Sequence, residues 1–156
     1  MKLVKDYMSS NVKNGKPTDT IFKVSKLLSK YDISGAPVVS NGKVIGVISE
    51  TDIMRFMKLD IHKTDVDIAA EPHVIGVVLI ELLREKLMEN TKLDKLKKIK
   101  VKDFMTKNVI SISPKESVLA AATMLDKYEI DRLLVIEKRK LVGLISRLDL
   151  IRALLD

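Results

Sequence analysis

The stretch Val44-Ile45-Gly46-Val47-Ile48-Ser49-Glu50-Thr51-Asp52 joins an apolar run to a polar tetrapeptide that begins with Ser and ends with Asp. The same pattern returns 97 positions later as Leu141-Val142-Gly143-Leu144-Ile145-Ser146-Arg147-Leu148-Asp149. Short apolar runs are typical of buried strands, and Ser followed by an acidic residue three positions later is typical of a helix start. Each copy therefore predicts a strand that ends where a helix begins.

The duplication extends well beyond this stretch. Residues 4–57 align with residues 101–154 without a gap, and the two copies share 18 identities in 54 positions. A unit of this size buries little apolar surface alone, so we expect the copies to share one core. The predicted organisation is a first repeat at 1–57, an insert at 58–100 and a second repeat at 101–156.

The second copy shows the order of its elements clearly. Ser113-Pro114-Lys115-Glu116 predicts a helix start, with Ser113 as the N-cap and Pro114 as the first helical residue. Apolar alternation and short apolar runs predict the other elements. In order, we expect a strand at 109–113, a helix to about Tyr128, strands at 133–136 and 141–145, and an amphipathic helix at 148–155.

The first copy follows the same plan with one difference. Asn41-Gly42 predicts a tight hairpin turn between its two strands. Asn14-Gly15-Lys16, by contrast, stands where the second copy has its first strand, and predicts an irregular segment.

The composition excludes several classes of protein. The 156 residues are 46% hydrophobic and 31% charged, which indicates a globular fold. The absence of cysteine excludes disulfides, thiolate metal sites and a cysteine nucleophile. No apolar segment has the length of a membrane span or of a signal core, so we expect a cytoplasmic protein without a membrane partner.

The two Ser-x-x-Asp motifs carry the chemistry of a candidate site. A helix N-terminus offers unpaired N–H groups and a partial positive charge, both of which suit a phosphate. An Asp there can accept hydrogen bonds from two ribose hydroxyls. Ser-x-x-Asp is equally a helix-capping pattern, in which the side chains bond the backbone of their own helix. The tetrapeptides alone favour capping.

Three motifs that recur in register give the repeats a family resemblance. They are Val4–Met8 with Val101–Met105, Ile33–Val39 with Ile130–Ile136, and Gly46–Asp52 with Gly143–Asp149. The chain resembles a tandem pair of cystathionine-β-synthase (CBS) domains. The resemblance implies an α+β fold of two β-α-β-β-α repeats, packed through their sheets about a pseudo-twofold axis. We expect the insert between them to be helical.

The resemblance also implies a function. CBS pairs are regulatory modules that bind AMP, ADP, ATP or S-adenosylmethionine in clefts between the repeats, and they commonly form dimers. Carried onto this sequence, the expected ligand-binding residues are Ser49, Asp52, Ile33, Gly35, Ala36, Pro37 and Ile48 in the first repeat, and Ser111, Ile130, Arg132, Leu133, Ile145, Ser146, Arg147 and Asp149 in the second. Ile48 and Ile145 are expected as apolar walls.

The two clefts are expected to differ. Arg132 stands where many family members place a cation that contacts phosphate, whereas the first copy has Gly35 there. Arg147 adds a second cation, where the first copy has Glu50. The Asp149 cleft is therefore predicted to suit a phosphorylated ligand better, although both arginines could equally be ordinary surface cations.

The insert and the remaining motifs leave alternatives open. A helix at about 75–90 is apolar enough to cover the module or to form a dimer contact, and His62 and His73 fit no compact metal motif. We therefore expect no metal site. The sequence also offers the aspartates no nucleophile or catalytic partner, so we do not expect an enzyme. The predicted partners are a second copy and a separate effector protein. A ligand-free interaction module is the main alternative, and nucleic-acid binding through Lys92–Lys100 is a weaker one.

Overall fold

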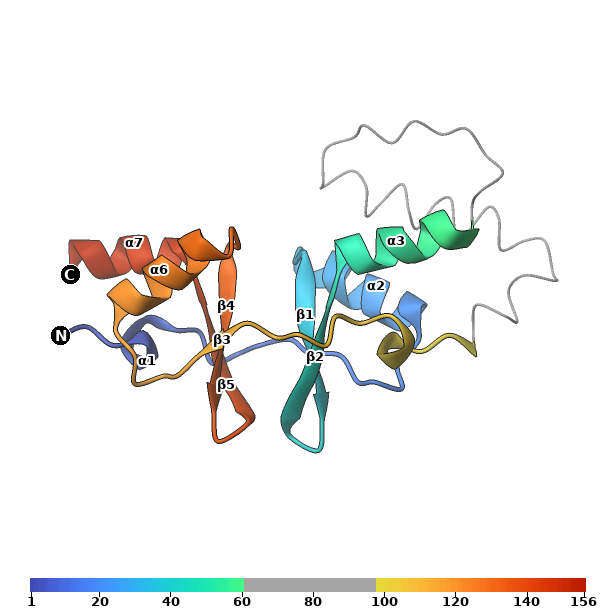
Figure 1. Cartoon of the computed structure of the whole chain (residues 1–156), viewed down its shortest axis with the longest axis horizontal. Coiled ribbons are helices and arrows are strands. Elements are labelled where there is room, and N and C mark those ends of the chain that lie inside the picture. Colours follow the sequence, from blue (N-terminus) through green and yellow to red (C-terminus); the bar gives the residue numbers. More distant parts are fainter. Residues whose placement is uncertain (61–97) are drawn as a thin grey trace.

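A computed structural model of the chain describes residues 1–60 and 98–156 (Figure 1). The predicted insert helix, the two histidines and most of the lysines of 92–100 lie outside these residues. No helix in the described part of the chain is long and apolar enough to cross a membrane.

The first repeat consists of three helices and one hairpin. Its elements are α1 (Val4–Tyr7), α2 (Ile21–Tyr31), β1 (Gly35–Ser40), β2 (Lys43–Ser49) and α3 (Glu50–Asp60). The segment at Asn14–Lys16 forms no named strand, as expected, and Gly15 makes only an isolated parallel bridge to Val38.

The second repeat has the same plan. Its elements are the 3-10 turn η1 (Val101–Asp103), β3 (Ser111–Ile112), α6 (Val118–Lys127), β4 (Arg132–Glu137), β5 (Lys140–Ser146) and α7 (Arg147–Leu155). The mixed α+β architecture predicted from the sequence is confirmed. The strand order is β1-β2-β5-β4-β3, with β2 and β5 joined at Lys43 and Lys140.

Both hairpins turn through two residues with positive φ. In the first, Asn41 has φ 50° and Gly42 has φ 75°, which are the values of the turn that suits the twist of a hairpin. In the second, Lys138 and Arg139 adopt φ 49° and 67° despite their side chains. The Asn-Gly signal thus located the first turn correctly, and the second forms on a less favourable sequence.

The start of α6 differs from the prediction. Ser113-Pro114-Lys115-Glu116 forms a turn, and Ser117 is the N-cap, whose side chain accepts the Ala120 N–H at 3.0 Å. The carbonyls of Pro114 and Glu116 instead accept N–H groups from the N-terminal segment, at 3.0 and 2.9 Å. These tertiary bonds use the backbone that an earlier helix start would have required.

The repeats exchange their leading segments, defined as residues 3–9 and 100–106. Val4 is fully buried in the second repeat, with Leu125, Leu133 and Ile145. Val101 is fully buried in the first repeat, and its N–H bonds the Asp19 carbonyl at 2.9 Å. The expected single shared core is therefore two separate apolar clusters, each completed by the other repeat. Figure 1 shows the two connections crossing the middle of the molecule in opposite directions.

Gly46 and Gly143 make this exchange possible. Residue Thr106 pairs with Val47 through two backbone bonds of 2.8 and 2.9 Å, and Ser9 pairs with Leu144 through two of 2.9 Å. A Cβ on Gly46 would lie 2.7 Å from the Met105 sulfur and 2.9 Å from the Thr106 carbonyl oxygen. The matching distances for Gly143 are 2.6 Å to the Met8 sulfur and 2.9 Å to the Ser9 oxygen. The glycine of the repeated stretch thus leaves room for the opposite leading segment.

We predict that Gly46→Ala destabilises the protein by about 1–3 kcal/mol, because a methyl group would displace the backbone at Thr106. Gly15→Ala is the matched control, since a Cβ there meets its nearest atom, in Val24, at an ordinary 3.5 Å. Urea unfolding of both variants measures the difference. Equal stability of the two variants would contradict the steric role of Gly46.

Candidate functional site

The Ser-x-x-Asp motifs lie at the two points where a strand passes into a helix. Ser49 ends β2 and Asp52 lies in the first turn of α3, and Ser146 and Asp149 occupy the same places in β5 and α7. The strand register sets Gly35 opposite Ser49 and Arg132 opposite Ser146. In each repeat the third residue of the middle motif therefore lies beside the serine of the end motif.

Asp52 is held by both repeats. Its Oδ2 accepts hydrogen bonds from the N–H and the hydroxyl of Ser49, each at 2.9 Å. Its Oδ1 accepts a bond from the Thr106 hydroxyl at 3.1 Å, and the Arg55 guanidinium lies 3.5 Å from the same oxygen. With only 4% of the residue exposed, both carboxylate oxygens of Asp52 have partners.

Asp149 makes the same cap but has fewer partners. Its Oδ2 accepts the Ser146 N–H at 2.8 Å and the Ser146 hydroxyl at 2.6 Å. Its Oδ1 contacts only Arg152, at 3.4 Å, among the described residues. Ser9, which aligns with Thr106, is exposed and gives Asp149 no such hydrogen bond. The Asp149 side chain is 14% exposed, against 4% for Asp52, and its Oδ1 is the more loosely held of its two oxygens.

Both motifs act as helix caps, the reading that the tetrapeptides alone favour. The cap uses Oδ2 of each aspartate and leaves Oδ1 for other partners. Capping and ligand binding are thus compatible, because they use different oxygens of one carboxylate. A ligand hydroxyl would have to displace Thr106 at Asp52, but only a long contact to Arg152 at Asp149.

The two predicted phosphate cations have different surroundings. The Arg147 guanidinium forms an ion pair with Asp131, in which Nε lies 3.1 Å from Oδ1. The backbone N–H of Arg147 also donates to the Asp131 carbonyl at 3.1 Å. Arg132 is exposed, and its guanidinium has no ion pair or hydrogen bond within residues 1–60 and 98–156. Arg132 is thus the cation beside Asp149 that remains available to an anion.

Most of the predicted apolar contacts lie in the cores. Ile48 and Ile145 are fully buried, and neither offers surface to a ligand in this structure, so their role as cleft walls stays a prediction. The other predicted residues divide by exposure. Ala36, Pro37 and Leu133 are buried, whereas Ile33, Gly35, Ser111 and Ile130 are half-buried.

Thr106 is the neighbour of the site that sequence reasoning missed. The repeat register contained a signal, because it aligns Thr106 with Ser9 and so places a hydroxyl at both positions. That register could not show that the hydroxyl lies against the aspartate of the opposite repeat.

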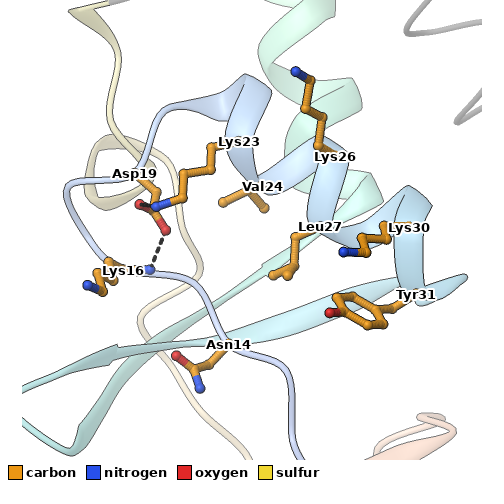
Figure 2. Close-up of a pocket in the computed structure, with 9 residues that line it drawn as sticks. All are labelled: Asn14, Lys16, Asp19, Lys23, Val24, Lys26, Leu27, Lys30 and Tyr31. Atoms are coloured by element: carbon orange, nitrogen blue, oxygen red, sulfur yellow. Dashed lines mark hydrogen bonds and ion pairs between the residues drawn. The ribbon is translucent and has the colours of Figure 1, made fainter.

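A groove of about 310 Å³ lies elsewhere, between α2 and the segment at Asn14–Lys16 (Figure 2), and contains none of the predicted site residues.

The CBS domain family model matches residues 4–59 and 101–156, and the chain belongs to this family. The uncharacterized protein MJ1426 of Methanocaldococcus jannaschii is 35% identical to this chain over 156 residues. The match covers 98% of this chain and 91% of that protein. The class is therefore that of proteins built from a tandem pair of CBS domains.

Two solved structures of similar fold contain ligands. CBSX2 in complex with AMP superposes with a TM-score of 0.68 at 21% identity, covering 99% of this chain and 97% of that one. The CBS domain pair of protein MJ0100, in complex with 5-methylthioadenosine and S-adenosyl-L-methionine, gives 0.66 at 23% identity, covering 98% and 99%. At these identities the likeness shows the fold.

We predict that Thr106→Val lowers stability by about 1 kcal/mol, because Asp52 loses a hydrogen bond that ties it to the second repeat. Ser9→Ala is the matched change at the aligned position and should alter stability far less. Chemical denaturation monitored by circular dichroism measures both. An equal loss in the two variants would argue against the asymmetry between the aspartates.

Proposed function

We propose that the protein is a regulatory module that binds an adenosine-containing ligand, with Asp149 as the principal contact to ribose. One observation supports this above the others: among the described residues, Asp149 Oδ1 has only a 3.4 Å contact to Arg152, and Arg132, opposite Ser146 in the strand pair, has no ion pair. The carboxylate would accept ribose hydroxyls, and the arginine would neutralise a phosphate.

The proposed ligands are AMP, ADP, ATP and S-adenosylmethionine. Family membership and the two ligand-bound relatives support an adenosine compound as the common element. Arg132 favours the phosphorylated ligands at Asp149. At Asp52, Gly35 supplies no charge, so an uncharged or cationic ligand would suit that side better.

The exchanged leading segments suggest how a ligand would produce a signal. The Asp52 carboxylate is bonded to Thr106 of the second repeat, so a ribose at Asp52 would replace a bond between repeats. A ligand shifts a conformational equilibrium only through different affinities for two arrangements. Occupation of Asp52 would favour an arrangement in which Thr106 is released, whereas occupation of Asp149 would leave this bond intact.

We propose that an effector protein receives the signal. We also propose that the protein acts in the cytoplasm and is not itself an enzyme. The main alternative is an interaction module without a ligand. Thermal unfolding with each adenosine compound separates the two, because a ligand that binds the native state raises the melting temperature.

We predict that Asp149→Ala weakens AMP binding by about 1–3 kcal/mol, or roughly 5- to 150-fold, through loss of charge-assisted hydrogen bonds. Asp149→Asn removes the charge while keeping a side-chain oxygen that can accept the Ser146 N–H. Arg132→Ala should weaken AMP much more than adenosine, since only AMP carries a phosphate. Isothermal titration calorimetry measures each affinity.

Asp52→Asn is the control at the other junction, and it should leave the stronger AMP site intact. Unchanged AMP affinity in Asp149→Asn and Arg132→Ala would exclude the Asp149 site. Failure of all four compounds to bind the wild-type protein would favour the ligand-free alternative.

We also propose a homodimer formed through α7 of the second repeat. Leu148, Ile151, Leu154 and Leu155 on this helix are 54–84% exposed, and Leu119 on α6 is 76% exposed. An exposed apolar surface of this kind marks an interaction site. Leu148 and Leu155 correspond to Thr51 and Lys58 of the first repeat, whereas the other three correspond to apolar residues, so two of the five apolar positions are specific to the second repeat. A second copy would pair this surface with itself about a twofold axis.

We predict that Leu148→Glu combined with Leu155→Glu converts the dimer to a monomer, because burying the carboxylates in the interface would cost more than the apolar contact gains. Thr51→Glu, at the position that aligns with Leu148, is the control and should leave the dimer intact. Light scattering after size exclusion gives the mass of each species. A wild-type protein that is monomeric at high concentration would remove this proposal.

A further inference from the structure

The groove on the first repeat is lined by a set of lysines. Its lining residues come from the segment before α2 and from α2 itself, and are Asn14, Lys16, Asp19, Lys23, Val24, Lys26, Leu27, Lys30 and Tyr31. Figure 2 shows Lys16 and Asp19 on one side and the side chains of α2 on the other. The groove includes neither Asp52 nor Asp149.

The groove is strongly positive. Four of its residues are exposed lysines, and Asp19 is the acidic one. Partial burial opposes ionisation of Asp19, but hydrogen bonds from the Lys23 side chain and the Lys16 N–H, with both lysine charges, hold its pKa below the ordinary value. Asp19 is therefore ionised at neutral pH, and the lining carries an excess of three positive charges.

Tyr31 closes one end of the groove and gathers further charge. The Lys13 ammonium lies 4.7 Å from the centre of its ring, and the Lys30 ammonium lies 5.4 Å from it. Lysines near an aromatic face are weakly attracted to it. Lys30 is already one of the four groove lysines, so Lys13 is the cation that this ring adds to the positive character of the groove.

The fold does not require these lysines. The second repeat forms the same helix and strands with Ser113, Ala120 and Thr123 at the positions of Lys16, Lys23 and Lys26. Of the four groove lysines, only Lys30 has a lysine counterpart, Lys127. The repeat thus provides an internal comparison, in which the charge is a property of the first repeat alone and needs another explanation.

We propose that this groove binds an extended acidic segment of a partner protein. Lys23 is already bonded to Asp19, whereas Lys26 and Lys30 have no ion pair among the described residues. These two lie four residues apart on α2, which is about 6 Å along the helix, or the length of about two residues of extended chain. Leu27 is half-buried between them and can pack against an apolar side chain that alternates with the carboxylates. Exposed lysines arranged in this way accelerate and orient association with an acidic partner.

A nucleic acid fits the same surface less well. Tyr31 is the aromatic residue of the lining, and both nearby lysines compete with a base for its ring. No arginine lines the groove, so the forked donors that read phosphates and base edges are missing there. The proposal concerns the first repeat alone and does not depend on adenosine binding.

The test uses the full-length protein without nucleotide and a fluorescent peptide of alternating Glu and Leu, about eight residues long. Lys16→Glu combined with Lys26→Glu reverses one charge on each side of the groove. Neither side chain has an ion pair or hydrogen bond in the described structure, so the fold should persist, which circular dichroism verifies. We expect the variant to bind the peptide about tenfold more weakly at low salt.

Lys107→Glu combined with Lys138→Glu is the matched control, since it changes the net charge equally at exposed positions outside the groove. It should weaken binding less than about twofold. In the wild-type protein, amide NMR shifts on peptide addition should concentrate at Leu27 and Tyr31. Equal losses in the two variants, or shifts spread over both repeats, would overturn the proposal. Tighter binding of a single-stranded oligonucleotide or of inorganic triphosphate in the groove would overturn the choice of partner.

Discussion

The backbone pairing of Thr106 with Val47, and of Ser9 with Leu144, is the interaction on which the rest of the structure depends. It requires a glycine beside it in each β-hairpin, because a side chain there would occupy the path of the opposite leading segment. Once the segments cross, each delivers a valine to the other repeat's core. The same crossing carries the Thr106 hydroxyl to Asp52, so the fold and the candidate site follow from one steric requirement.

The sequence predicts the local elements well because their causes are local. Asn41-Gly42 turns the first hairpin, and the two apolar runs of the second repeat become strands within one residue of the predicted bounds. The strand predicted at 109–113 is shorter, and consists of Ser111 and Ile112. The start of α6 could not be predicted in the same way, since the N–H groups that bond the Pro114 and Glu116 carbonyls come from residues more than 100 positions away. The exchange itself is also invisible to the repeat pattern. Two similar copies predict the same contacts whether a segment packs on its own repeat or on the other.

The candidate site likewise has features that the local sequence predicts and features that depend on tertiary contacts. Ser-x-x-Asp predicts both a cap and an accessible carboxylate, and the capping bonds are present at both junctions. The difference between Asp52 and Asp149 depends on a hydroxyl from the opposite leading segment, which no local pattern reveals. Arg147 shows the same limit, because its pairing with the adjacent Asp131 depends on side-chain geometry rather than on residue type. The lysines of α2 are regularly spaced in the sequence, but they line a groove only because the segment at 14–16 lies beside the helix.

The reciprocal crossing also bears on the origin of the chain. An exchange in which each partner gives the other the same segment is what a twofold homodimer of single repeats would make. Duplication of the gene followed by fusion would convert that association into an intramolecular one, at an effective concentration set by the connection and independent of the amount of protein. Freed from the need to match a partner identical to itself, each half could then diverge. Threonine in place of serine beside Asp52, the arginine beside Asp149 and the lysines of one helix are differences that a symmetric ancestor could not have acquired on one side alone.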